Sequence, residues 1–176
     1  MAVDNPTYLL LGLLILALII GGPFLKGWAN RKAASAGENA GKKFAASQLV
    51  KVLPEFGTTL IIHAPEHSAR EIVAEAAAKK PKDFPARADG GYGIRFAEAD
   101  DTIVRLVPDP AGTRVQVETF REYMGFPQTA PFWKDLRERI SSAAGAHGTA
   151  VSEGPQLEYL RGALLDPKNA RWTLDA

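Results

Sequence analysis

The segment TIVRLVPDPAGTRVQVET, residues 102–119, determines the class of fold. It begins with a β-branched run from Thr102 to Val107. Asp109-Pro110-Ala111-Gly112 then has the composition of a tight turn, with proline where φ is fixed and glycine where φ can be positive. Beyond the turn, apolar and polar residues alternate from Arg114 to Thr119, which is typical of a half-buried strand. Two strands joined by so short a turn are antiparallel neighbours, so the segment predicts an antiparallel sheet.

Two further strands are predicted upstream. Residues 92–97 alternate between larger apolar residues and Gly93, Arg95 and Ala97, and they connect to the hairpin through a link of hairpin length, residues 98–101. Residues 58–64 form a short β-rich run bounded by Gly57 and Pro65. The sequence therefore predicts four strands.

Two helices are predicted between and after these strands. The first begins near Pro65, has a capping box in Ser68 and Glu71, and ends at Lys79-Lys80-Pro81. Its apolar stripe is narrow and mostly alanine, which favours close packing against a sheet. The second helix has Thr129 as its predicted cap and ends at Gly145 or Gly148. Its apolar face contains Phe132, Trp133, Leu136, Ile140 and Ala143.

These elements predict an α+β domain over residues 54–150, in the order β-α-β-β-β-α, with both helices on one face of the sheet. A C-terminal extension over residues 151–176 is predicted to contain a third short helix, because Leu157, Leu160 and Leu164 have helical spacing before Asp166-Pro167 interrupts it. The tail that carries Trp172 either docks on the domain or stays loose.

Residues 1–25 are predicted to contain a transmembrane anchor. Nothing charged interrupts the sequence between Asp4 and Lys26, and the apolar stretch over residues 7–25 is long enough to cross a bilayer as one helix. Basic residues follow the stretch and none precede it, so the N-terminus is expected outside the cell membrane and the domain in the cytoplasm. A cleaved secretory signal is the competing interpretation, since residues 34–36 resemble a cleavage site, but the N-terminal residues lack positive charge.

A basic stalk over residues 26–53 connects the anchor to the domain. Its second half has helical spacing of apolar residues from Phe44 onward, which predicts a short amphipathic helix that Pro54 ends. Two roles are open for the basic residues: they bind anionic lipid headgroups, or they only fix topology. The residues expected at the membrane surface are Lys26, Trp28, Arg31, Lys32, Lys42 and Lys43.

Charge and composition exclude several classes of function. The chain has a net charge of +1, Asp4 contributes −1 and residues 26–51 contribute +5, so residues 52–176 carry −3. A mildly acidic domain is a poor nucleic-acid binder, because such binding depends on neutralising phosphates. The chain has no cysteine, which excludes disulfides, cysteine-ligated zinc and a thiol nucleophile.

Polar residues with catalytic potential do not form a recognisable site in the sequence. His63 and His67 are four residues apart, but Pro65 lies between them and they do not share a helical face, so no metal site is predicted. Gly90-Gly91-Tyr92-Gly93 leads into a strand rather than a helix, which favours a turn over a phosphate loop. The acidic residues of the 98–101 link are expected to be solvated. The sequence predicts no catalytic residue and no cofactor.

The strand Leu60-Ile61-Ile62-His63-Ala64-Pro65, followed by a helix, meandering strands and a last helix bearing Phe132, Trp133 and Leu136, resembles the helix-grip fold of polyketide-cyclase and START-like lipid-binding families. The resemblance implies a last helix lying across a curved sheet and enclosing an apolar pocket. Those families have more strands than the four predicted, so an enclosed pocket would need two copies. The aromatic residues expected to line such a pocket are Tyr92, Phe96, Phe120, Tyr123, Phe132 and Trp133.

Two functions are therefore predicted. The first is a single-pass, membrane-anchored protein whose domain is a non-enzymatic interaction module, with another membrane protein or a second copy as partner. The alternative is a binding module for an apolar small molecule or lipid.

Overall fold

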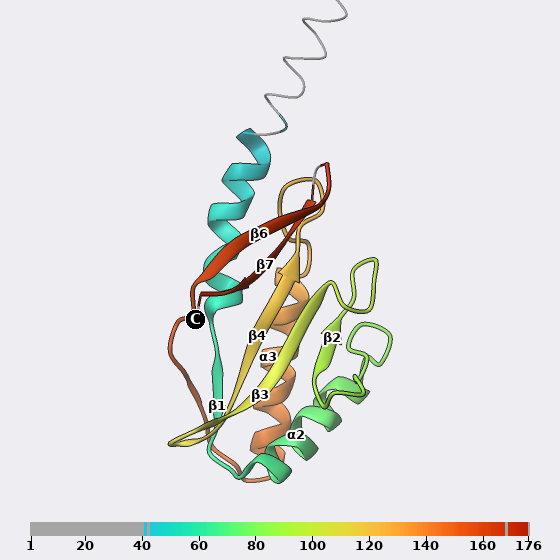
Figure 1. Cartoon of the computed structure of the whole chain (residues 1–176). Helices are drawn as coiled ribbons and strands as arrows, with labels where there is room; N and C mark the ends of the chain where they lie inside the picture. Colours follow the sequence, from blue (N-terminus) through green and yellow to red (C-terminus); the bar gives the residue numbers. More distant parts are fainter. Residues whose placement is uncertain (1–40, 42, 168, 176) are drawn as a thin grey trace, which may run out of the picture. The chain divides into compact units, whose positions relative to one another are not determined.

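The computed structural model describes residues 41, 43–167 and 169–175 (Figure 1). The chain divides into two compact units, Met1–Phe44 and Ala45–Ala176, and the fold below is that of the second unit. The predicted anchor and most of the stalk lie outside the described residues. Within the described residues, no helix has the length and apolar character needed to span a membrane.

The described chain is α+β with an antiparallel sheet, as the sequence predicts, and three helices pack against the sheet where the prediction had two. A helix over residues 43–57 comes first. The elements that follow it are β1 (Leu60–Ile62), α2 (Glu66–Ala78), β2 (Tyr92–Ile94), β3 (Thr102–Asp109), β4 (Gly112–Arg121), α3 (Ala130–Ala146), β5 (Val151–Glu153), β6 (Tyr159–Asp166) and β7 (Asn169–Leu174).

The sheet is organised around β4, the longest strand. The predicted meander of β2, β3 and β4 is confirmed, with antiparallel pairing throughout. One edge of β4 pairs with β3, and the opposite edge is divided between two strands. On that edge, β1 pairs with residues 113–115 and β7 pairs with residues 119–121. The sheet then continues from β1 to β5 and from β7 to β6, and Figure 1 shows β6 and β7 crossing in front of the upper part of β4.

The predicted C-terminal helix is wrong, because residues 151–176 contribute three strands. The described residues therefore form seven strands rather than four. The 157–164 leucine spacing fits a helix, but β6 leaves Leu160 and Leu164 exposed and takes its hydrogen bonds from β7. Asp166-Pro167 lies at the turn between these two strands, where the Asp166 carboxylate accepts from the backbone and side-chain nitrogens of Asn169 at 3.1 and 2.7 Å.

One predicted helix boundary and one predicted cap are also wrong. The first helix continues through Pro54 to residue 57. Proline removes only the donor to the carbonyl of Val50, and Val50 is an exposed residue whose carbonyl can bind water. Helix α2 has Pro65 as its N-cap with φ of −58° and no side-chain cap, so the predicted Ser68–Glu71 capping box does not form.

The second predicted cap lies at the expected position but has another role. Thr129 is the N-cap residue of α3, yet its side chain makes no capping bond. Its hydroxyl is instead 2.6 Å from that of Thr102 on β3. This buried contact ties the start of α3 to the sheet.

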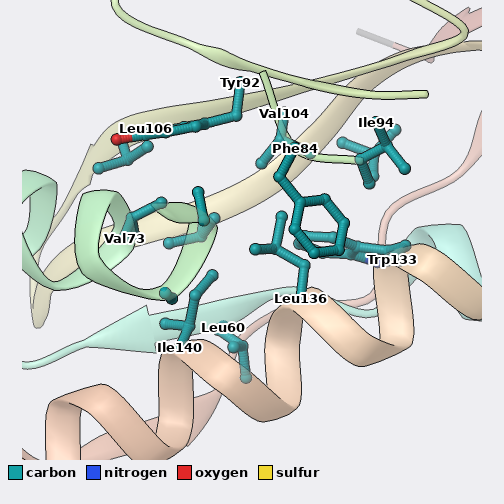
Figure 2. Close-up of a cluster of buried hydrophobic side chains, with 14 of the residues drawn as sticks. Leu60, Val73, Phe84, Tyr92, Ile94, Val104, Leu106, Trp133, Leu136 and Ile140 are labelled. Atoms are coloured by element: carbon teal, nitrogen blue, oxygen red, sulfur yellow. The ribbon is translucent and has the colours of Figure 1, made fainter. Parts of the chain in front are cut away.

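The hydrophobic core lies between the sheet and the helices α2 and α3 (Figure 2). Helix α2 packs through Ala69, Ala76 and Ala77 together with Ile72 and Val73, so its backbone can come close to its neighbours, as predicted from the alanine-rich stripe. Helix α3 contributes Trp133, Leu136 and Ile140, all of which are fully buried. The Trp133 indole also donates to the carbonyl of Thr58 at 3.3 Å, which satisfies its buried N–H.

A stack of aromatic rings holds the C-terminal tail on the sheet. Phe120 of β4 stacks on Phe56 with a centroid distance of 4.1 Å and on Trp172 with a distance of 5.8 Å. Tyr159 approaches Phe120 edge-on, and its hydroxyl donates to the carbonyls of Phe56 and Val117 at 3.1 and 2.8 Å. The tail therefore docks, and it packs against both the first helix and β4.

Candidate interaction groove

An open cavity of about 440 Å³ lies between helix α3 and strand β5. We call it the α3–β5 groove. It is lined by Leu60, Lys134, Arg137, Glu138, Ser141, Val151, Ser152 and Glu153.

Helix α3 forms one wall of the groove through a single polar stripe. Arg137, Glu138 and Ser141 follow Lys134 by three, four and seven residues. At this spacing the four side chains lie on one face of the helix. Arg137 is held in place by an ion pair with Glu55 and by the Trp133 ring, whose centroid is 5.4 Å from its guanidinium carbon. Burial lowers the pKa of Arg137, and the nearby carboxylates of the groove partly oppose this effect.

Strand β5 forms the other wall and ends the path of the sheet. The backbone N–H of His63 donates to the carbonyl of Ala150 at 3.0 Å, and the backbone N–H of Gly154 donates to the carbonyl of Thr59 at 3.1 Å. Peptide groups alternate in direction along an antiparallel strand, so the N–H and C=O groups of Val151 and Glu153 face away from β1. Among the strands of the described residues, β5 pairs with β1 alone, and its outer edge is therefore open.

A histidine side chain also holds β5 in place. The ring Nδ1 of His63 is 3.1 Å from the carbonyl of Ala111, so this nitrogen carries the hydrogen and donates it. Nε2 then accepts from the hydroxyl of Ser152, at 2.9 Å. His63 thus connects β5 to the β3–β4 turn, whereas His67 lies exposed on α2.

A second open cavity, of about 310 Å³, lies between α2 and the loop that precedes β2. It includes Gly90, Gly91 and Tyr92, the segment predicted to form a turn. Gly90 has φ of +80°, and its carbonyl accepts from Arg70 at 2.7 Å. Burial raises the pKa of Tyr92, and Arg70 partly opposes this effect. The positive φ is consistent with a turn, and glycine is the residue that adopts it without strain.

The six aromatic residues predicted to line a ligand pocket do not gather around one cavity. Phe120 and Trp133 are fully buried in the core, Tyr92 is also buried, Tyr123 and Phe132 are half-buried, and Phe96 is 51% exposed. Of the six, Tyr92 alone lines either of the two cavities described above. The apolar-ligand hypothesis stays a prediction. Of the residues expected at the membrane surface, Lys43 is described and is exposed, and the others lie outside the described residues.

Two buried carboxylates were missed by the sequence analysis. Asp101, expected to be solvated, is fully buried: one oxygen accepts from the backbone N–H groups of Phe96, Ala97 and Glu98, and the other accepts from the Tyr123 hydroxyl at 2.6 Å. The pKa of Tyr123 is raised mainly by burial and, to a smaller extent, by its hydrogen bond to Asp101.

The other missed carboxylate is Glu122, at the end of β4, which is also fully buried. It accepts two hydrogen bonds from Arg161 on β6, one from the indole of Trp172 and one from the backbone of Ala170. Its position two residues after Phe120 could have indicated that it points to the core side of the strand.

Comparison of the chain with known protein families, with curated proteins and with solved structures finds no match. The α3–β5 groove is therefore interpreted from its own geometry.

Proposed function

We propose that this protein is a membrane-anchored, non-enzymatic interaction module whose α3–β5 groove binds an extended segment of another membrane protein. The observation that carries the proposal is the open edge of β5 beside a cavity of about 440 Å³. Binding by strand addition needs such an edge, since backbone hydrogen bonds give affinity and adjacent pockets give specificity.

The groove provides both an open strand edge and an adjacent pocket within a short length of chain. The backbone groups of Val151 and Glu153 face outward and are available to pair with an added strand. Leu60 and Val151 give the groove an apolar floor that suits one apolar side chain of the partner. Lys134 and Arg137 line the groove together with Glu138 and Glu153, so a segment with both charge signs would be matched better than a uniformly charged one.

The membrane location rests on the apolar stretch over residues 7–25. A protein tethered by one helix meets other proteins of the same membrane at raised effective concentration. A weak, short strand addition can therefore be sufficient for function. In this arrangement the domain faces the cytoplasm, and the basic stalk lies at the membrane surface.

The proposal can be tested with two substitutions at neighbouring positions of α3. Ser141 lines the groove and is exposed, whereas the next residue, Ser142, is also exposed and is not among the lining residues. Ser141→Trp fills the groove, and Ser142→Trp adds the same side chain outside it. The full chain, extracted in detergent from host membranes, is expected to co-purify with a membrane protein in the wild-type and Ser142→Trp forms but not in the Ser141→Trp form.

Hydrogen exchange then tests the mode of binding. In the complex, the amides of Val151 and Glu153 are expected to gain protection, because they are the groups that an added strand would pair with. The proposal is wrong if the full chain purifies alone at every expression level. It is also wrong if a partner binds the Ser141→Trp form as well as the wild type.

A further inference from the structure

The exposed large hydrophobic side chains of the unit Ala45–Ala176 are concentrated near one end. In the described residues of that unit they are Val50, Phe96, Met124, Leu160, Leu164 and Leu165. They belong to the first helix, to the loops over residues 95–101 and 122–129, and to the β6–β7 hairpin. Figure 1 shows these segments toward the end of the sheet opposite the β3–β4 turn.

Specific contacts bring these segments together. The backbone of Met124 donates to the side chain of Asn169 at 2.7 Å, which joins the 122–129 loop to the β6–β7 turn. A Cβ added to Gly125 would lie 3.0 Å from the Cβ of Ala45, so the same loop contacts the start of the unit. Phe96 reaches the loop through Tyr123, with a ring centroid distance of 5.5 Å.

We define the apex as the side chains of Phe96, Met124, Leu164 and Leu165. Met124 is 75% exposed, and Phe96, Leu164 and Leu165 are 51%, 57% and 50% exposed, so at least half of each residue's surface is accessible to solvent. On soluble proteins, large exposed apolar patches mark sites of protein or membrane interaction.

The backbone of the apex is fixed rather than loose. Met124 has φ of 55°, a left-handed conformation that non-glycine residues rarely adopt. Bonds between Tyr123 and Phe126 and from Met124 to Asn169 hold this turn. A strained turn that directs an apolar side chain into solvent is an independent sign of a functional contact.

We propose that the apex is a lipid-binding surface that rests on the same bilayer that holds the predicted anchor. The chain enters the unit at Ala45, beside the apex, and the apolar stretch ends only about twenty residues earlier in the sequence, at Leu25. The side chains that enter the headgroup layer are Met124, Leu164 and Leu165, which lie on loop and hairpin tips.

A bilayer fits this surface better than a second copy of the chain. A stable protein interface takes about 20–30 residues on each side, in close shape complementarity. The apex offers a few projecting side chains from separate segments, which can enter a fluid layer without a shaped partner.

The apex contact would set the orientation of the whole domain. Strand β4 runs from Gly112 at the β3–β4 turn to Arg121 beside the apex. At about 3.3 Å per residue, this places the β3–β4 turn roughly 30 Å farther from the membrane than the apex. In a domain attached to the membrane by its stalk alone, the apex and the β3–β4 turn would have no fixed difference in distance from the membrane.

The absence of cysteine allows a direct test on the full chain reconstituted in phosphatidylcholine liposomes with some anionic lipid. Met124→Cys, Leu164→Cys and the control Ala111→Cys, at the distal β3–β4 turn, each receive an environment-sensitive fluorophore. Phospholipids with a nitroxide near the headgroup are expected to quench the labels at 124 and 164 by about twofold and to leave the label at 111 unchanged.

A second substitution separates the apex from the anchor. With the label at 124, Leu164→Glu is expected to abolish most of the quenching while the chain stays in the liposome fraction, and Ala111→Glu is expected to have no effect. The inference is overturned if the chain is retained but no apex label is quenched. A label that shifts its emission without lipid quenching would indicate a protein contact instead, which also overturns it. A chain that leaves the liposomes refutes the anchor and the apex contact together.

Discussion

Replacing Glu122 with glutamine should strongly destabilise the fold, although the two side chains have nearly the same shape. The carboxylate is fully buried and accepts four hydrogen bonds. Arg161 donates two at 2.7 Å, the Trp172 indole donates one at 2.8 Å and the backbone of Ala170 donates one at 3.1 Å. Each carboxylate oxygen accepts two of the four bonds.

The magnitude follows from the donor count. A glutamine amide has one oxygen, so in either orientation two of the four donors face an NH₂ group instead of an acceptor. The charge that balances Arg161 is lost at the same time. The Arg161 side chain is 47% exposed, so water can solvate the unpaired guanidinium and the lost charge itself costs little. The buried donor left without an acceptor costs about 1–3 kcal/mol, which is a sizeable part of the roughly 5–15 kcal/mol that stabilises a typical domain.

The same carboxylate predicts a dependence on pH. Burial raises the pKa of Glu122, but the hydrogen bonds from Arg161 and Trp172 lower it by more, so its pKa in the fold lies below the ordinary value. The ionised form therefore stabilises the fold at pH values above the ordinary pKa of a glutamate. This stabilisation is lost as the pH falls through the lowered pKa, so the difference in stability between wild type and Glu122→Gln should shrink in acid.

Urea unfolding of residues 45–176, followed by the fluorescence of the buried Trp133 and Trp172, measures this difference at neutral and acidic pH. Glu118→Gln on the same strand is the matched control. Its side chain is 44% exposed and pairs with Arg105, so it should cost less than about 1 kcal/mol. The reasoning fails if Glu122→Gln also costs less than about 1 kcal/mol, or if its cost is equal at both pH values.

Three further substitutions test other parts of the fold. Phe120→Ala removes the centre of the aromatic stack, and the free energy of unfolding should fall by about 3–5 kcal/mol in urea titrations. Asp101→Ala leaves three backbone donors without their acceptor, and hydrogen exchange should accelerate over residues 96–98 without a matching change in the distant α2. Gly93→Ala should destabilise by more than about 2 kcal/mol in thermal unfolding, because its Cβ would lie 1.9 Å from the carbonyl oxygen of Ala99. Gly145→Ala is its control: it meets open space in α3 and should stabilise the fold by about 0.5–1 kcal/mol.

The elements that sequence reasoning predicted correctly are those whose signals are local. The β3–β4 hairpin carries its own turn chemistry in Asp109–Gly112 and its own alternation on both sides, so neighbouring residues are sufficient to specify it. The helices α2 and α3 likewise show their apolar stripes within one window of sequence. Their caps were predicted less well, because Thr129 bonds to Thr102 on a distant strand.

The elements that were missed depend on distant partners. Strand β6 has leucines at helical spacing and few buried positions, so its own residues favour the wrong structure. It is a strand because β7 pairs with it, and β7 is held by contacts of Trp172 with Phe120 and Glu122, some fifty residues earlier in the chain. A propensity argument cannot include these contacts, since tertiary packing overrides local preference.

The candidate groove was hidden for the same reason. The apolar face predicted for α3 does not include Lys134, Arg137, Glu138 or Ser141, so the residues of one wall were predicted to lie off the core. The second wall is β5, a strand of three residues at the start of the extension over residues 151–176, which was predicted to contain a short helix and no strand. A site formed between a predicted helix and an unpredicted edge strand cannot be found before the sheet is known.

The division of one β4 edge between β1 and β7 brings the C-terminal tail into contact with the end of the first helix. Strand β1 pairs with β4 only over residues 113–115, so the last turn of the first helix can place Phe56 on Phe120. The tail then covers this junction: Gln156 donates to the carbonyl of Pro54 at 2.7 Å, and the hydroxyl of Tyr159 donates to that of Phe56. The residues after α3 therefore fasten the first helix to the domain. The same tail carries Leu164 and Leu165 of the apex on β6, so the contacts that hold the first helix and the contacts that position the apex belong to one segment of the chain.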